Sequence, residues 1–465
     1  PVSSASSPWP APTVPWAPHG ARCPGQSATT SAAAAAGIQI EHVVTDLGDL
    51  GAAHPNTYVL TLQGARESHT LTALSTGGGM IEVIEIDGCP LSILGDCYET
   101  LLYLEGDADQ AAQALASQLT ADALLIHRGP NVTLIEVKDQ HFPDLDVIYS
   151  LARQYEIRTM KHLSPVLPVL TPSNLALPFL TGAELLAYNR ERGLDLGELA
   201  VRYECARGGL APDEVLAKMR AIVDLLYDSI RAGIEGTDYS DRILGPQARG
   251  YLRQMGQGRL LGGGMLDLVI LYVTALMEVK SAMGLIVAAP TAGACGALPG
   301  ACLAAADALE RPREETARAM LAGGLIGVFI AHRATFAAEV GGCQAECGAG
   351  SGMAAAALIT LAGGTAEQAV AAASMALQNV LGLVCDPVAN RVEVPCLGRN
   401  VMAASNALAC ANMALAGYDA VIPLDEVIAA MDEIGRSLPA ALRCTALGGL
   451  SITPTSQAIQ ASLNH

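Results

Sequence analysis

Four prolines between residues 164 and 178 divide the chain into two stretches with different hydrophobic patterns. Before them, apolar and polar residues alternate, as in Met80–Ile86 (MIEVIEI), and this predicts β-strands. After them, apolar runs separated by Gly-rich breaks predict packed helices. Only 4% of the residues are aromatic, so the core must consist of small aliphatic side chains. We therefore expect an α+β protein, with a small N-terminal α/β region followed by a large all-helical domain.

The N-terminal region contains a β-α-β-β-α-β pattern, which is the order of a ferredoxin-like unit. Amino-acid-sensing modules and plain structural units share this topology, and both interpretations stay open. The expected organisation is a disordered leader (1–37), a partial α/β region (38–98), the ferredoxin-like unit (99–163), a linker (164–178) and the helical domain (179–465).

Charge and composition exclude two classes of partner. The formal net charge of -19 argues against binding a nucleic-acid backbone. The sequence has no run of about 18 consecutive apolar residues, which is the length that would predict a membrane span. The 12 cysteines are dispersed through apolar surroundings, which is typical of free thiols in a reducing cytoplasm. We expect a cytoplasmic protein whose partner is a small molecule.

Three cysteines are the candidate metal ligands: Cys343, Cys385 and Cys396. Each adjoins glycine or proline at a break in a helical pattern, where a thiolate can point at a shared iron or zinc. Their spacing matches neither zinc fingers nor bacterial ferredoxins, so spacing and composition alone favour buried free cysteines. Cys347 is a rival ligand, because it lies four residues after Cys343 and can share a helical face with it.

Residues from about 173 to 456 resemble the alpha part of the iron–sulfur L-serine dehydratases, also called L-serine ammonia-lyases. Weaker similarity to the family's beta part covers about residues 40–100, including HPNT at 54–57 and STGGG at 75–79. The stretches that carry the alpha resemblance are APTAG (289–293), EVGGCQAE (339–346), QNVLGLVCDPV (378–388), VEVPCLGRN (392–400) and TALGGL (445–450).

The resemblance implies that Cys343, Cys385 and Cys396 hold a [4Fe-4S] cluster whose fourth iron binds the substrate hydroxyl. It implies a lyase of amino-acid degradation and gluconeogenesis that converts L-serine to pyruvate and ammonia. His54 is the candidate proton carrier. The candidate substrate-binding residues are Ser75, Gly77, Gly78, Thr291, Ala292, Gly293 and Asn400.

The sequence departs from the family pattern in its first segment. The Ser-Ser-Ser-His-Thr and Gly-His-Gly-Thr-Asp stretches of the beta part, which carry the proton-abstracting histidine, have no counterpart here. We therefore expect an enzyme that is incomplete alone, working as a homo-oligomer or with a beta-type chain. Two other functions stay open, a cysteine desulfidase of related type and a non-catalytic metal-binding partner subunit.

Overall fold

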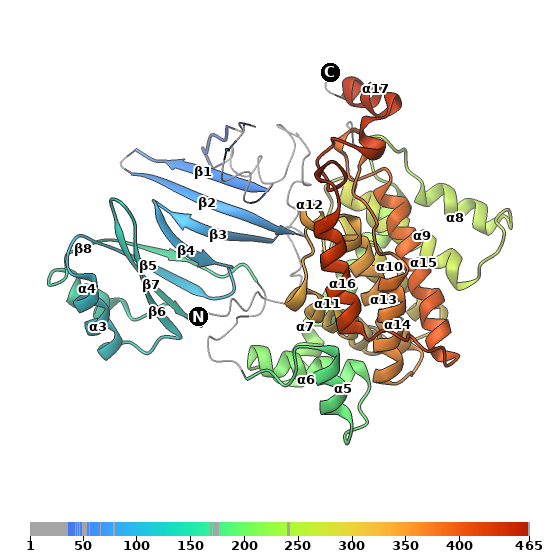
Figure 1. Ribbon diagram of the computed structural model, residues 1–465, viewed down its shortest axis with the longest axis horizontal. Helices are drawn as coiled ribbons and strands as arrows, with labels where there is room; N and C mark the ends of the chain where they lie inside the picture. Colours follow the sequence, from blue (N-terminus) through green and yellow to red (C-terminus); the bar gives the residue numbers. More distant parts are fainter. Residues whose placement is uncertain are drawn as a thin grey trace.

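The computed structural model describes residues 36–463 except 42, 44, 46, 49–53, 55, 66, 78–79, 168–169, 171–175 and 240–241. Two antiparallel sheets come first in these residues and a large helical region follows, which confirms the predicted α+β class. Figure 1 shows the two sheets, with two short helices, on one side of the molecule and the large helical region on the other. Almost all of the predicted leader and part of the predicted linker lie outside the described residues.

The first sheet is an antiparallel meander with strand order β1-β2-β3-β4. Alternating apolar residues produce its two-faced strands, as the sequence predicts for Met80–Ile86. Its strands are β1 (Thr57–Gln63), β2 (Ser68–Gly77), β3 (Met80–Ile86) and β4 (Cys89–Ile93).

The second sheet has the strand order β6-β7-β5-β8 and two helices, which is the predicted ferredoxin-like arrangement. Asp107 and Asp144 cap the two helices by accepting backbone N–H groups of the first turn. The elements are β5 (Tyr98–Leu104), α3 (Ala108–Gln118), β6 (Ala123–Arg128), β7 (Thr133–Asp139), α4 (Leu145–Ala152) and β8 (Ile157–Leu163).

The two sheets pack face to face. Ile86 and Leu91 of the first sheet share a buried cluster with Leu101 and Leu134 of the second. The other face of the second sheet is covered by α3 and α4, whose apolar side chains form a separate core with β5 and β7. The N-terminal region is therefore a layered structure in which the helix-free face of the ferredoxin-like unit is covered by the β1–β4 sheet (Figure 1).

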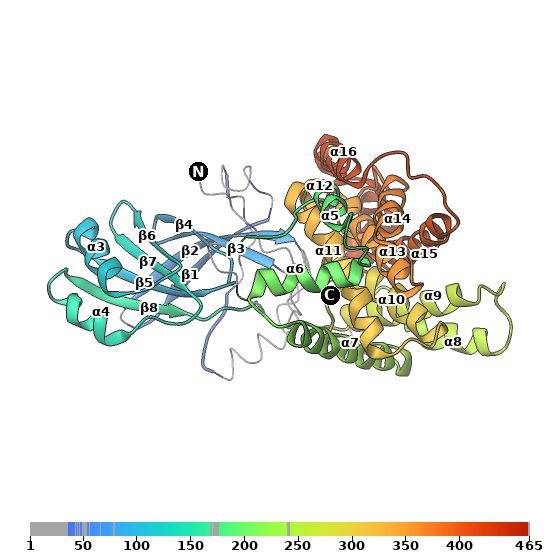
Figure 2. The ribbon, with the colours of Figure 1, turned by 90° about the horizontal axis from the view of Figure 1, so that it is seen from below.

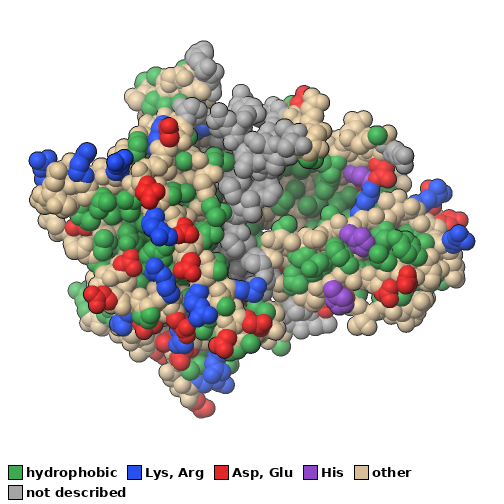
Figure 3. Space-filling view, turned by 180° about the vertical axis from the view of Figure 1, so that it is seen from behind, with side chains coloured by type: hydrophobic (Ala, Val, Ile, Leu, Met, Phe, Trp, Pro, Cys, Tyr) green, Lys and Arg blue, Asp and Glu red, His purple; other side chains and the backbone are tan. Residues whose placement is uncertain are grey.

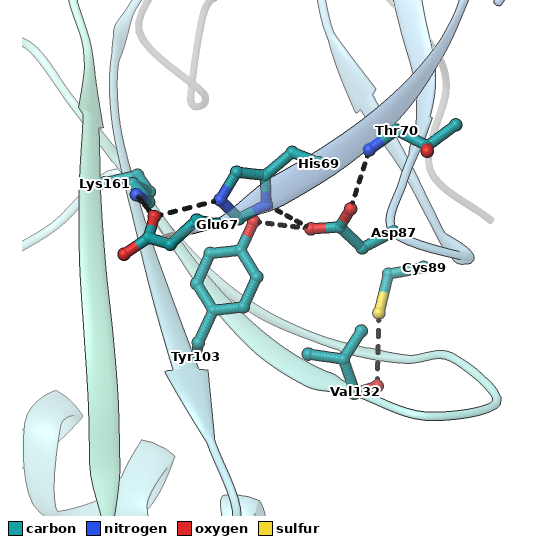
Figure 4. Close-up of polar contacts among 8 residues, drawn as sticks. All are labelled: Glu67, His69, Thr70, Asp87, Cys89, Tyr103, Val132 and Lys161. Carbon is teal, nitrogen blue, oxygen red and sulfur yellow. Dashed lines mark hydrogen bonds and ion pairs between the residues drawn. The ribbon is translucent and has the colours of Figure 1, made fainter. Parts of the chain in front are cut away.

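A polar network joins the two sheets (Figure 4). Nδ1 of His69 lies 2.7 Å from Oδ2 of Asp87, which also accepts the Tyr103 hydroxyl at 3.1 Å. Nε2 of His69 lies 3.3 Å from Glu67, which pairs with Lys161 of β8. The bond to Asp87 raises the pKa of His69. Burial opposes ionisation of Asp87, but its bonds to His69 and to the Thr70 N–H lower its pKa overall.

The helical domain begins at α5 and continues to the end of the described chain. Sequence signals mark several helix ends: Pro212 is the first residue of α7, and the TAEQ sequence at 365–368 forms a capping box at the start of α14. The helices are α5 (Gly182–Asn189), α6 (Leu196–Gly208), α7 (Pro212–Glu235), α8 (Ala248–Gly256), α9 (Met265–Ser281), α10 (Ala297–Ala308), α11 (Arg313–Arg333), α12 (Ala338–Gly341), α13 (Ala349–Leu361), α14 (Ala366–Gln378), α15 (Cys396–Leu415), α16 (Leu424–Ser437) and α17 (Pro454–Leu463).

Helix α13 lies at the centre of this domain, enclosed by α10, α11, α14 and α15 (Figure 2). Its sequence, AGSGMAAAALITL, is apolar on all sides, and nearly every residue is buried. Small side chains allow very close approach: a Cβ on Gly323 of α11 would lie 2.9 Å from the Met353 carbonyl. The low aromatic content thus corresponds to a core of closely spaced helices, as predicted.

Charged side chains of both signs are interspersed over the surface of the helical domain, and histidines appear on the sheet region (Figure 3). Within the described ranges, no helix combines the length and the apolar character needed to cross a lipid bilayer.

Candidate functional site

The three predicted cysteines come from three separate segments, and all are buried. Cys343 follows α12, immediately before a short π-helical turn (Gln344–Gly348). Cys385 forms an isolated parallel β-bridge with Arg443. Cys396 is the first residue of α15. Each therefore lies at a break or end of a helix, as its glycine and proline neighbours indicate.

Backbone contacts hold the Cys343 and Cys385 segments together. The Gln344 N–H donates to the Leu383 carbonyl at 3.1 Å, and the Gln344 side chain accepts the Gly382 N–H at 2.8 Å. Gly342 has a left-handed φ of 74°, and a Cβ there would lie 2.9 Å from the Leu383 carbonyl. Glycine at position 342 thus allows both the turn before Cys343 and the close approach of the second segment.

Arg399 links all three cysteine segments. It lies one turn into α15 after Cys396, and its Nη2 is 2.7 Å from Oδ1 of Asp386. Its Nη1 donates to the Val384 carbonyl at 2.7 Å. The guanidinium also interacts with the Cys343 thiol. A single, partly buried cation therefore connects the segments of Cys343, Cys385 and Cys396.

The thiols differ in acidity. A hydrogen bond from Cys347 lowers the pKa of Cys343; burial opposes this, and the Arg399 charge supports it. The neighbouring Cys444 thiol and burial raise the pKa of Cys385, and burial raises that of Cys396. Cys385 and Cys396 lie at turns or helix ends, where we expect backbone N–H groups to stabilise a thiolate. The Cys444 thiol and burial outweigh that effect at Cys385, and burial outweighs it at Cys396.

Two further cysteines belong to this centre. Cys347 hydrogen-bonds to Cys343 and accepts the Asn400 amide at 3.4 Å, so it remains a rival ligand. Cys444 contacts Cys385 and packs against the same buried cluster. Sequence reasoning did not select Cys444, because no spacing signal relates it to a cysteine 59 positions earlier in the chain.

Asn400 fixes the predicted substrate loop rather than pointing a free amide at it. Its Oδ1 accepts the Gly296 and Ala297 N–H groups, at 3.2 and 3.1 Å. Its Nδ2 donates to the Gly293 carbonyl at 2.8 Å and to the Cys396 carbonyl at 2.9 Å. Asn400 is fully buried, so it positions the 289–293 loop against the start of α15.

Glu346 is a carboxylate that sequence reasoning noted in the EVGGCQAE stretch but did not select. Thr291 donates to its Oε1 at 2.8 Å, and a Cβ on Gly293 would lie 2.8 Å from the same oxygen. Burial raises the pKa of Glu346 to about 8, and the charges of Cys343 and Glu339 add to this effect. Buried Lys280 lies nearby and donates to the Val392 carbonyl. Two of the predicted loop residues, Thr291 and Gly293, thus surround one carboxyl group, and Ala292 lies between them.

The N-terminal candidates are linked to the same centre through Asn56 and Glu339. Nδ1 of His54 accepts the Asn56 N–H at 3.2 Å, and the Asn56 side chain donates to Glu339, four residues before Cys343. Ser75 on β2 is buried, and its N–H donates to the Asn56 carbonyl at 3.0 Å. Gly77 ends β2, and Gly78 lies outside the described residues.

The donor set suits a cluster better than a single metal ion. In the part of the chain that the structure describes, no three His, Cys, Asp or Glu side chains group closely enough to ligate one ion. In a [4Fe-4S] cluster each thiolate binds a different iron, so the ligands surround the cluster instead of meeting at a point. Buried soft donors from three segments, with the Arg399 cation beside them, fit that requirement.

Comparison with known proteins gives the family. A family model described as the serine dehydratase alpha chain matches residues 187–451. The probable L-serine dehydratase alpha chain of Bacillus subtilis (strain 168) is 39% identical over 277 residues, covering 60% of this chain and 92% of its own. The L-serine dehydratase alpha chain of Peptoniphilus asaccharolyticus is 38% identical, with 60% and 96% covered. Escherichia coli (strain K12) L-serine dehydratase 1 is 35% identical, with 59% and 62% covered.

Most of the helical domain and the buried cysteine centre lie within the matched region, which is more than half of the chain. The protein belongs to the serine dehydratase alpha-chain family. The matched region begins within α5, so the two N-terminal sheets lie outside it.

Proposed function

We propose that this protein is an L-serine ammonia-lyase that converts L-serine to pyruvate and ammonia with a [4Fe-4S] cluster held by Cys343, Cys385 and Cys396. Membership of the family supports the reaction class. The observation that carries the cluster assignment is Arg399, whose contacts draw the three cysteine segments together.

The cluster, when bound, would supply a Lewis acid that stabilises the hydroxyl of serine as it leaves. The chain's own residues shape the surroundings. Asn400 fixes the 289–293 loop, and Thr291 orients the Glu346 carboxyl group. Arg399 places a positive charge beside thiolates that are otherwise buried among apolar residues. We propose that Ser75, Gly77 and Gly78 approach the substrate from the sheet region.

His54 is the proposed proton acceptor. The contact between Asn56 and Glu339 supports this role, because it ties the residues next to His54 to the segment that leads to Cys343. The geometry sets one condition. Since Nδ1 accepts the Asn56 N–H, proton uptake at Nδ1 requires that hydrogen bond to open.

We further propose a cytoplasmic enzyme of amino-acid degradation that assembles with a second copy or with a beta-type chain. Support for assembly comes from the names of two relatives, which are alpha chains. Size-exclusion chromatography with light scattering, with and without a beta-type chain, tests this.

Anaerobic purification tests the function. We expect a brown protein with about four irons and four sulfides per chain, and pyruvate released from L-serine. A protein that stays colourless after reconstitution would rule out the cluster. Parallel assays with L-cysteine separate a dehydratase from a desulfidase: faster release of sulfide from cysteine would reassign the reaction. Iron binding without turnover, rescued by adding a beta-type chain, would identify a partner subunit.

A further inference from the structure

Cys385 and Cys444 are held side by side by their backbones. The Cys385 N–H donates to the Leu442 carbonyl, and the Cys444 N–H donates to the Cys385 carbonyl, both at 2.8 Å. These bonds form the parallel bridge between Cys385 and Arg443. Cys385 faces Arg443 and Cys444 is the next residue, so the N–H···O bond between the two cysteines keeps their Cα atoms within the range of separations that disulfides span.

Their thiols also face each other. The Cys444 thiol is near enough to that of Cys385 to raise its pKa, and Cys444 packs against the buried cluster that contains Cys385. Cys444 adopts a left-handed backbone conformation, with φ of 59°, which non-glycine residues rarely adopt. The bridge therefore holds Cys444 in an unusual conformation with its sulfur toward Cys385.

Solvent reaches the two sulfurs unequally. Cys385 is only 4% exposed, and Cys343, Cys347 and Cys396 are similarly buried. Cys444 is half-buried. An oxidant arriving from solvent would therefore meet Cys444 first.

We propose that Cys444 is a redox-modification site that forms a disulfide with Cys385 when no cluster is bound. A hydroperoxide oxidises the Cys444 sulfur to a sulfenic acid; its O–O bond breaks, and it leaves reduced to an alcohol, or to water if it is hydrogen peroxide. The Cys385 sulfur then attacks the sulfenic sulfur, the S–O bond breaks, and water leaves with the Cys385 proton. Thiol reductants reverse the bond by exchange.

The consequence for cluster loading rests on the proposed function, although the disulfide itself does not. With Cys385 in a disulfide, one of the three proposed ligand thiols is withdrawn. At the same time, its sulfur is protected from irreversible oxidation to the sulfinic acid. Oxidised apoprotein would accept iron only after reduction.

Peptide mapping of the full-length apoprotein tests the disulfide. The protein is treated with one equivalent of hydrogen peroxide under anaerobic conditions, its free thiols are blocked, and a non-reducing digest is analysed by mass spectrometry. We expect a linked pair of peptides containing Cys385 and Cys444, absent in Cys444→Ser and retained in Cys205→Ser, whose thiol is also half-buried but lies on α6. A disulfide between Cys343 and Cys347, a Cys343–Cys385 disulfide, or stable overoxidation of Cys444 without a crosslink would overturn the proposal.

Iron uptake is the second readout. After peroxide treatment, wild-type protein should bind several-fold less iron than after subsequent reduction, whereas Cys444→Ser should bind equal amounts in both states. Thermal melting of Cys444→Ser and Cys444→Ala checks that the variants fold. The mapping and iron-uptake experiments can use either variant that folds. If fully reduced wild-type protein binds no cluster, the proposed function fails while the mapped disulfide stands. Equal iron uptake by oxidised and reduced wild-type protein would show that the disulfide does not block cluster loading.

Discussion

The side-chain amide of Asn56 donates a hydrogen bond to the carboxylate of Glu339, 283 residues further along the chain. Asn56 precedes β1, and Glu339 lies in α12 just before Cys343. The same carboxylate raises the pKa of Tyr58 on β1, although burial of that phenol is the larger cause. This contact brings the sheet region, with His54, to the edge of the cysteine centre.

Replacing Asn56 should therefore lower activity without loss of the cluster. Asn56→Asp would place two carboxylates together and should reduce kcat for serine at least tenfold, at unchanged iron content. Glu339→Gln can keep a hydrogen bond, so we expect a smaller loss. Steady-state kinetics with iron analysis on the same samples measures both effects. If Asn56→Asp also removes the iron, the contact supports the cysteine segment itself rather than the placement of His54.

Each proposed ligand should be needed for iron binding. Cys343→Ala, Cys385→Ala and Cys396→Ala should each lose most of the bound iron and the visible absorption of the cluster. Cys302→Ala, in the buried core of α10, should retain both. Cys347→Ala tests whether Cys347 is a ligand in place of Cys343. Full iron content in this variant would exclude Cys347 as a ligand. Loss of iron would mean that Cys347 replaces one of the three proposed ligands.

Arg399→Gln should destabilise the helical domain even in the apoprotein. It leaves Asp386 buried without its cationic partner, and loss of one member of a buried pair typically costs about 3–5 kcal/mol. Arg436→Gln breaks the exposed pair with Asp432, for which about 0–1 kcal/mol is typical. Urea unfolding of both variants gives the comparison. Equal stability of the two would show that Arg399 does not hold the cysteine segments together.

Gly293→Ala should impair turnover by displacing Glu346. The added methyl group would meet both carboxylate oxygens, at 2.8 and 3.1 Å. Gly398→Ala is a matched control on α15, because its Cβ meets no neighbouring atom and alanine favours the helix by about 1 kcal/mol. We expect kcat to fall at least tenfold in the first variant and to stay unchanged in the second. If Gly293→Ala has the same kcat as the wild type, the position of the Glu346 carboxylate does not matter for turnover.

The polar network around His69 should make stability depend on pH. Because the pKa of His69 is raised in the folded state, its protonated ring stabilises the fold fully at pH values below the unfolded pKa of about 6.5. This contribution is lost as the pH rises through the folded pKa of His69. The lowered pKa of Asp87 stabilises the fold above about 3.9, and this contribution is lost as pH falls through the folded value.

His69→Gln should therefore lower the melting temperature most between about pH 4 and 6.5, and by less as the pH rises through the folded pKa of His69. His141→Gln is the control, since that ring is 77% exposed. Differential scanning fluorimetry across pH measures the difference between each variant and the wild type. A difference that does not vary with pH would mean that the charge of His69 does not contribute to the contact between the sheets.

Local patterns predicted the elements well. The alternation in Met80–Ile86 gave β3 to the residue, and the pattern around Thr365 gave the capping box of α14. The apolar run from Met265 to Ala282 corresponds to α9, which ends at Ser281. These signals are local, because strand alternation and helix capping depend on residues within a few positions of one another.

The site was predictable only where a residue type carries the chemistry. Cysteines beside glycine and proline could be selected as candidates, but which breaks in the helices meet is decided by packing between distant segments. Arg399 reaches Asp386 and Val384, and Asn400 reaches Gly293, more than 100 residues away. The acidity of the cysteines could not be predicted for the same reason. Burial raises the pKa of Cys396, and burial is a property of the folded chain.

The covered face of the ferredoxin-like unit determines how that unit is connected to the cysteine centre. The β1–β4 sheet packs across that face and is hydrogen-bonded to it through Asp87 and Tyr103, so the two sheets form one layered body. Asn56, which precedes β1, joins this body to α12. The ferredoxin-like unit is therefore connected through the β1–β4 sheet to the residue four positions before Cys343.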